Sequence, residues 1–141
     1  MTQNDKYRRD YVAFINDMVD KGYAEKVPNE SLKTENGKAW YVPHHGVYHP
    51  KKPEKIRVVF DCSAKFGGTS LNEQLLQGPD LTNSLVGVLT RFRQEPVAFM
   101  GDIEAMFYQV RVPVYQRDFM RFLWWPGGDL NAEPAEYRMT V

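Results

Sequence analysis

One aspartate in the sequence follows a pattern that presents metal ligands. Asp102 comes after the apolar run Val97 to Met100 and a single glycine. A buried strand fixes the backbone and the turn after it exposes the next carboxylate, so this pattern is typical of a magnesium ligand. The same spacing equally predicts a structural role for Asp102 as the cap of a following helix. Spacing alone leaves both interpretations open.

A group of cations precedes this aspartate. Arg57 lies in the β-branched and aromatic run Ile56 to Phe60, and three lysines stand just before it: Lys51, Lys52 and Lys55. A guanidinium can hold a phosphate through two parallel hydrogen bonds, so Arg57 is a candidate ligand of a triphosphate. The alternative is structural, because Arg57 could pair with Glu54 or Asp61 along the same hairpin.

Three other features carry weaker signals. His44, His45 and His49 do not favour a zinc site, because neighbours on a strand point to opposite faces and no cysteine lies near them. The turn Gly127-Gly128-Asp129 has no helix after it, which argues against a phosphate loop. The pair Trp124-Trp125 could stack on bases, but such a pair more often places one ring in the core and one in an interface.

Two helices are expected to position these residues. The first spans Asp5 to Lys21 and ends at Gly22, with one apolar face built at helical spacing: Tyr7, Tyr11, Ile15 and Met18. The second spans Leu81 to Phe92 and is capped by Asp80 or Thr82, and its apolar face carries Leu81, Leu85, Val88, Leu89 and Phe92.

The remaining elements are short strands and loops. A hairpin is expected from Trp40 to Phe60, with its turn over His49 to Lys55, and Lys26 to Lys38 reads as a loop. Further strands are expected at Val97 to Met100, Phe119 to Trp125 and Tyr137 to Val141, with a compact turn or short helix at Ile103 to Gln109. The fold class is therefore α+β, with antiparallel hairpins and two main helices.

Composition bounds the possible functions. Apolar residues make up 43% of the 141 residues, which is enough for a packed core, and no apolar run approaches the length of a membrane span. The net charge is zero, but residues 1–65 hold twelve Lys and Arg against nine Asp and Glu, a net +3, and the remainder balances this at −3. A basic front and an acidic back would suit phosphate binding and metal binding, although charge alone favours ordinary surface scatter. The single cysteine, Cys62, excludes an internal disulfide, and we expect an intracellular protein, cytoplasmic or nuclear.

Two motifs, taken in order, resemble those of a known family. The string Phe99-Met100-Gly101-Asp102-Ile103-Glu104-Ala105-Met106-Phe107-Tyr108-Gln109-Val110 resembles the first catalytic motif of reverse transcriptases. Upstream, Ile56-Arg57-Val58-Val59-Phe60-Asp61 resembles a strand of the fingers, and Ser70-Leu71-Asn72 resembles the recurrent Leu-Asn step. With the run Tyr41-Val42-Pro43-His44-His45-Gly46-Val47, the combination is similar to the polymerase of Pao/BEL-type LTR retrotransposons.

The resemblance implies a role for individual residues. Asp102 would bind Mg²⁺ as the catalytic carboxylate, and the Ile103 carbonyl would assist. Arg57 would clamp the incoming triphosphate, with Lys55 or a neighbouring lysine supplying a second charge. Phe107 would exclude the ribose 2′-OH, although it could also be plain core, and Tyr108 and Met106 are taken as core packing. The implied partners are an RNA or DNA template-primer and deoxynucleoside triphosphates.

The resemblance also implies an incomplete right-hand polymerase. Residues 1–74 would be the first part of the fingers, 75–111 the start of the palm and 112–141 a second, truncated part of the fingers. The second catalytic motif of the family is an Asp-Asp pair, and the sequence contains none. We therefore expect a fragment of an RNA-directed DNA polymerase that is inactive alone. The alternative is a non-catalytic remnant that binds nucleic acid or another partner, and the oligomeric state stays open.

Overall fold

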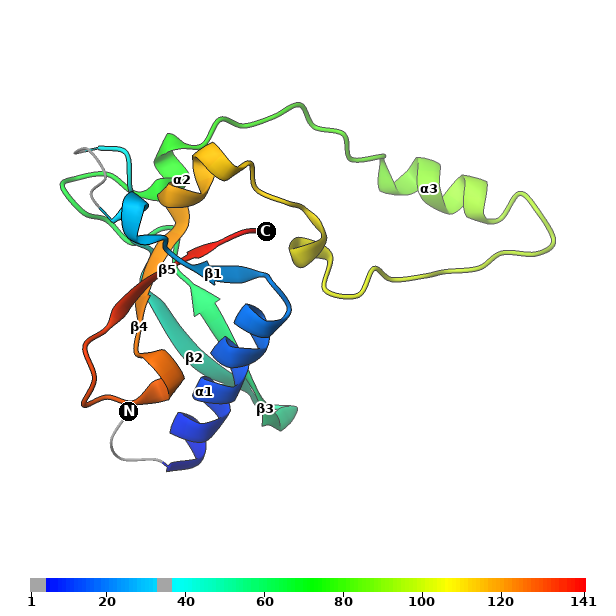
Figure 1. Cartoon of the computed structure of the whole chain (residues 1–141). Helices are drawn as coiled ribbons and strands as arrows, with labels where there is room; N and C mark the ends of the chain where they lie inside the picture. Colours follow the sequence, from blue (N-terminus) through cyan, green and yellow to red (C-terminus); the bar gives the residue numbers. More distant parts are fainter. Residues whose placement is uncertain (1–4, 33–36) are drawn as a thin grey trace.

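The elements of the chain follow from a computed structural model, which describes residues 5–32 and 37–141. The helices are α1 (Asp5–Asp20), α2 (Leu71–Gln74) and α3 (Leu85–Phe92), with short 3₁₀ turns η1 (Asn29–Ser31), η2 (Met106–Gln109), η3 (Val114–Met120) and η4 (Pro126–Gly128). The strands are β1 (Ala24–Lys26), β2 (His44–His49), β3 (Lys52–Phe60), β4 (Arg121–Trp124) and β5 (Ala135–Met139). All pairing between these strands is antiparallel, so the α+β class is confirmed (Figure 1).

Helix α1 forms where its apolar period predicts it. Three residues of the expected face, Tyr11, Ile15 and Met18, are buried. The helix ends at Gly22, whose φ of +70° is the left-handed conformation that glycine adopts without steric cost. The Tyr23 N–H then donates to the Met18 carbonyl at 2.8 Å, which closes the last turn. Local sequence alone therefore sets this element.

A three-stranded sheet in the order β1-β5-β4 joins the two ends of the chain. Ala24 lies opposite Met139, and Phe122 lies opposite Tyr137. Strand β1 was not predicted, and its last residue, Lys26, was assigned to the loop that follows. Three residues that pair with a distant strand carry no periodic signal of their own. Residues 33–36 of that expected loop lie outside the described residues.

The expected hairpin forms from β2 and β3, with His44 opposite Phe60 and Val47 opposite Arg57. Its turn is shorter than predicted, because Lys52 to Lys55 already belong to the strand and only Pro50 and Lys51 link the two strands. Pro53 is tolerated there since β3 is an outer strand of a two-stranded sheet.

The core lies between α1, the hairpin and β4, and it draws on both ends of the chain. Ile15, Phe122 and Trp124 are each 2% exposed or less. The Trp124 ring stacks on Tyr11, with ring centroids 5.3 Å apart and planes 13° from parallel. Buried residues of α1, β1, β3, β4 and β5 thus form one cluster.

The segment from Leu75 to Arg111 forms an arm that extends away from this core (Figure 1). Helix α3 begins at Leu85, later than predicted, because the Ser84 hydroxyl rather than Asp80 or Thr82 accepts the N–H of its first turn. Its apolar face is exposed, with Leu85 at 71% and Leu89 at 48%. The whole chain consequently exposes 11320 Å², whereas a compact protein of its mass exposes about 7,500 Å².

The strand predicted at Val97 to Met100 does not form. These residues are extended and unpaired, and Val97, Phe99 and Met100 are each more than 80% exposed. A strand needs a neighbour for its backbone groups, and no other described segment lies beside this one. Among residues 5–32 and 37–141, no helix combines the length and apolar character that crossing a membrane requires.

Candidate functional site

The outer face of the hairpin carries the predicted cations. Alternation along β3 buries Ile56 and Val58 and leaves Lys55 and Arg57 exposed on the opposite face. Arg57 makes no ion pair with any residue that the structure describes, so neither proposed partner holds it. Asp61 instead accepts the Ser63 N–H at 2.9 Å and the Ser63 hydroxyl at 2.5 Å. The guanidinium of Arg57 therefore faces solvent.

Asp102 lies in the arm, between α3 and η2, and the described residues form no metal site around it. Its carboxylate accepts the N–H of Ile103 at 3.0 Å. It does not cap a helix, because η2 begins at Met106 with Ala105 in the cap position. Within the described ranges, no three His, Cys, Asp or Glu side chains are grouped to hold a metal ion. One carboxylate and the Ile103 carbonyl fall short of the ligands that two divalent ions need.

The two hydrophobic residues predicted near the nucleotide are exposed. Phe107 is 81% exposed and Ile103 is 63% exposed. Phe107 therefore does not pack into the core of this chain, which was the alternative to a nucleotide contact. Met106, expected in the core, is 50% exposed, and that expectation is wrong. Tyr108 is the residue of this group that packs.

The ring of Tyr108 brings the Asp102 segment back to the core. It stacks on Tyr23, just after α1, with ring centroids 4.6 Å apart and planes 6° from parallel. Burial raises the pKa of the Tyr108 hydroxyl, and the nearby Arg57 guanidinium opposes that shift. The charge of Arg57 on β3 therefore reaches Tyr108 of the η2 turn, although the two residues are about fifty residues apart in the sequence.

A left-handed residue sets the direction of this turn. Ala105 has φ 50° and ψ 44°, the one non-glycine residue with positive φ in the described part of the chain. An alanine in this conformation costs roughly 1–2 kcal/mol. The Tyr108 N–H then donates to the Ala105 carbonyl at 2.8 Å, which closes the turn. Alanine carries no sequence signal for this conformation, so the turn could not be predicted.

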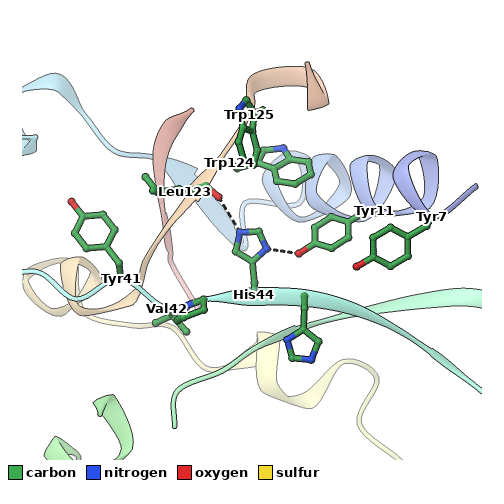
Figure 2. Close-up of a pocket in the computed structure, with 10 residues that line it drawn as sticks. Tyr7, Tyr11, Tyr41, Val42, His44, Leu123, Trp124 and Trp125 are labelled. Carbon is green, nitrogen blue, oxygen red and sulfur yellow. Dashed lines mark hydrogen bonds between the residues drawn. The ribbon is translucent and has the colours of Figure 1, made fainter. Parts of the chain in front are cut away.

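An aromatic hollow of about 500 Å³ lies between α1, β2 and β4 (Figure 2). Its walls are mainly rings: Tyr7, Tyr11, Tyr41, His44, Trp124 and Trp125. Figure 2 shows His44 in its middle, bonded on both sides. One ring nitrogen of His44, Nε2, donates to the Leu123 carbonyl at 2.9 Å, and the other, Nδ1, accepts from the Tyr11 hydroxyl. Burial lowers the pKa of His44, so the neutral ring fits this arrangement.

Sequence reasoning missed this aromatic hollow, although the signal was present. Strict alternation from His44 to Tyr48 places His44 on the inner face of the hairpin and His45 on the outer one. Of the tryptophan pair, Trp124 is buried and Trp125 is half-buried, so one ring is in the core as expected.

A second hollow of about 520 Å³ lies on the other side of the contact between α1 and η4. Arg8 and Arg9 line it, together with one carboxylate, that of Asp5. The Arg8 guanidinium donates to the Gly128 carbonyl at 3.1 Å, so this contact fixes one of the two arginines. We call this second hollow the arginine hollow.

Comparison with protein-family models and with curated proteins finds no match to this chain.

Proposed function

We propose that this chain carries the nucleotide-binding face and the first catalytic carboxylate of a retrotransposon reverse transcriptase of the Pao/BEL type. In this proposal residues 1–74 and 112–141 are fingers, and residues 75–111 begin the palm. The partners are an RNA or DNA template-primer and deoxynucleoside triphosphates. The observation that carries the proposal is the Tyr23–Tyr108 stack, which holds η2 and its exposed Phe107 against the core that includes the β3 residues on both sides of Arg57.

This arrangement supports the proposal because it brings two motifs that are far apart in the sequence to the same core. Arg57 and Phe107 come from motifs far apart in the sequence, and neither side chain contributes to the buried core. Both are exposed, as a ligand contact requires. Under the proposal, Arg57 holds the triphosphate and Phe107 contacts its sugar.

The division of the chain into core and arm also supports it. The segments assigned to the fingers share one buried cluster, whereas the segment assigned to the palm exposes its apolar residues. A palm segment needs further strands to cover it, and these would come with the Asp-Asp pair that the sequence does not contain. In a complete polymerase, Asp102 and the Ile103 carbonyl would help bind Mg²⁺, which activates the primer oxygen and steadies the leaving group.

A second candidate function is a non-catalytic interaction with nucleic acid. It is favoured by the single carboxylate at Asp102, which cannot complete a two-metal site, and by the exposed cations at the hairpin tip: Lys51, Lys52 and Lys55. Under this function the cations act as point charges and Arg57 has no geometric role.

Triphosphate binding separates the two functions. We would titrate the chain with a magnesium deoxynucleoside triphosphate in the presence of a primer-template, and compare wild type with Arg57→Lys and Arg57→Gln. The polymerase proposal expects both variants to lose about tenfold or more in triphosphate affinity, because a lysine cannot reproduce a bidentate contact. Arg93→Gln is the charge-matched control, because Arg93 is exposed at the end of α3 on the arm.

The non-catalytic function predicts a different pattern. Oligonucleotide binding would then fall with each lost charge and with rising salt, Arg57→Lys would equal wild type, and triphosphate would not compete. Equal triphosphate binding by wild type and Arg57→Gln would contradict the assignment of Arg57.

A further inference from the structure

We propose that the aromatic hollow and the arginine hollow together form a binding site for single-stranded nucleic acid, distinct from the outer face of the hairpin. A base would stack in the aromatic hollow while its neighbouring phosphate lies on Arg8 and Arg9. The choice of nucleic acid as ligand rests on the proposed function, and the location of the site rests on the geometry below.

The two hollows flank a single contact. Tyr7 and Tyr11 of α1 line the aromatic hollow, and the residues directly after them, Arg8 and Val12, line the arginine hollow. On the other side, Trp125 lines the first hollow and Gly128, three residues later, lines the second. A strand that leaves one hollow across the Arg8–Gly128 contact therefore enters the other.

The partly exposed rings of the aromatic hollow include Tyr41 and Trp125, whereas Tyr11 and Trp124 stack on each other in the core. The Tyr41 hydroxyl donates to Glu136 at 2.8 Å, and the Tyr7 hydroxyl accepts the Gly46 N–H at 2.9 Å. Tyr41 is 45% exposed, and Trp125 is half-buried against the edge of Trp124, with planes at 75°. Fixed rings with open faces are the platform on which unpaired bases stack, at about 1–3 kcal/mol per base.

Charge favours a nucleic acid over an apolar peptide. Lys6 is paired with Asp10 at 2.6 Å, which leaves Arg8 and Arg9 against the single carboxylate of Asp5 beside the hollow. A proline-rich peptide would use the rings but gain nothing from the arginines. A duplex would keep its bases stacked inside and could not reach the rings, so the ligand is single-stranded.

The test measures fluorescence anisotropy of a labelled deoxythymidine oligonucleotide of about 12 nucleotides, a length within the range of stacking sites. The comparison ligands are the same strand in a duplex and a labelled proline-rich peptide. Trp125→Leu should weaken binding of the single strand about tenfold, and Trp125→Phe should restore most of it, because the phenyl ring keeps a stacking face. Arg9→Gln should reduce the slope of log K against log salt by about 0.7.

Matched controls come from outside the two hollows. Phe66→Leu removes an 82% exposed ring from a distant loop, and Arg93→Gln removes an exposed guanidinium from the arm. Neither should change the affinity for the single strand. Thermal melting of each variant shows whether Trp125→Leu still folds, and the recovery with Trp125→Phe separates stacking from general loss of structure.

The hairpin variant Arg57→Gln makes the two proposals separable. Loss of binding in Arg57→Gln with no effect of Trp125→Leu and Arg9→Gln would overturn this site and leave the proposed function standing. The reverse pattern would support this site, and triphosphate binding by Arg57→Gln stays the separate test of the proposed function. No single-strand binding by wild type, or binding of the peptide alone, would overturn the site as well.

Discussion

Tyr108 lies face to face with Tyr23, and this contact fixes the position of the segment that carries Asp102. The two rings are 4.6 Å apart and 6° from parallel. One ring follows α1 and the other belongs to η2, so the stack ties the returning end of the arm to the core. Next to it, the Val112 N–H donates to the Thr140 carbonyl oxygen at 2.9 Å, a bond that does not depend on the rings.

Removing this stack should loosen η2 without unfolding the core. Such aromatic pairs contribute about 0.5–1.5 kcal/mol, so Tyr108→Ala should speed amide exchange at Gln109 about two- to tenfold. Tyr108→Phe keeps the ring and should exchange as wild type does. Hydrogen exchange read by NMR checks this, with the Val112 amide as the internal reference. Equal exchange in all three proteins would mean that the stack does not hold the turn.

Two glycines permit α1 to approach its neighbours, and alanine should not be tolerated at either. A Cβ on Gly128 would lie 2.2 Å from Val12 Cγ2, and Gly128 has φ +73°. A Cβ on Gly46 would lie 2.8 Å from Ile56 Cδ1. Overpacking costs about 1–3 kcal/mol, and the left-handed conformation adds about 1–2 kcal/mol at Gly128. Urea denaturation should therefore rank Gly128→Ala below Gly46→Ala in stability, while Gly78→Ala, where nothing lies within 4 Å, should equal wild type.

The stability of the fold should fall in mild acid because of His44. Burial lowers the pKa of this histidine, so the unfolded chain binds its proton more readily than the folded chain does. Its contribution is complete above about pH 6.5 and is lost as the pH falls below that value, with a slope of at most about 1.4 kcal/mol per pH unit. In His44→Gln, the midpoint of urea denaturation should change less between pH 6.5 and 5 than it does in wild type. An unchanged slope in that variant would assign the acid sensitivity to another group.

A buried charged residue of the sheet should contribute more to the free energy of unfolding than an exposed one at the end of α1. Arg121 is fully buried and bonds Asp118 at 2.9 Å and Glu136 at 2.8 Å, and its third bond goes to the Ser31 carbonyl at 2.6 Å. Arg121→Ala leaves Asp118 with Arg138 and Glu136 with the Tyr41 hydroxyl, so it should cost about 3 kcal/mol in urea denaturation, the lower end of the range for breaking a buried ion pair. Lys21→Ala removes an exposed pair with Asp17 and should leave the midpoint unchanged.

Chemistry by this chain alone should be absent. Asp102 is the one carboxylate assigned to metal binding, and two ions need more. Primer extension with Mg²⁺ or Mn²⁺ should stay at background for wild type and for Asp102→Asn alike. Incorporation by wild type that Asp102→Asn abolishes would show that a second carboxylate of this chain completes the site.

The sequence predicted those elements whose signals are local. Helix α1 carries its period and its stop at Gly22 within one stretch, and the alternation of β3 places Lys55 and Arg57 outside. Elements defined by a partner were missed or misjudged. Strand β1 exists because β5 pairs with it, and Val97 to Met100 has the composition of a strand but no neighbour among the described residues.

The candidate site was predictable in its residue types but not in its arrangement. Strand alternation exposes Arg57, and an acid after an apolar run marks Asp102. Their relation depends on Ala105 in a left-handed conformation and on the ring of Tyr108 reaching Tyr23. Neither the backbone angle of an alanine nor a contact across eighty-five residues of chain leaves a periodic trace in the sequence.

The pairing of β1 with β5 has a consequence for folding during synthesis on the ribosome. Residues 24–26 leave the ribosome more than one hundred residues before their partners, residues 137–139. The apolar face of α1, which carries Tyr11, Ile15 and Met18, therefore stays uncovered until Phe122, Trp124 and Tyr137 have been made. Contacts of such long sequence separation form slowly. Until residues 122–137 have been made, the nascent chain has no complete core, and its earlier residues depend on these later ones, or on a chaperone, to avoid aggregation.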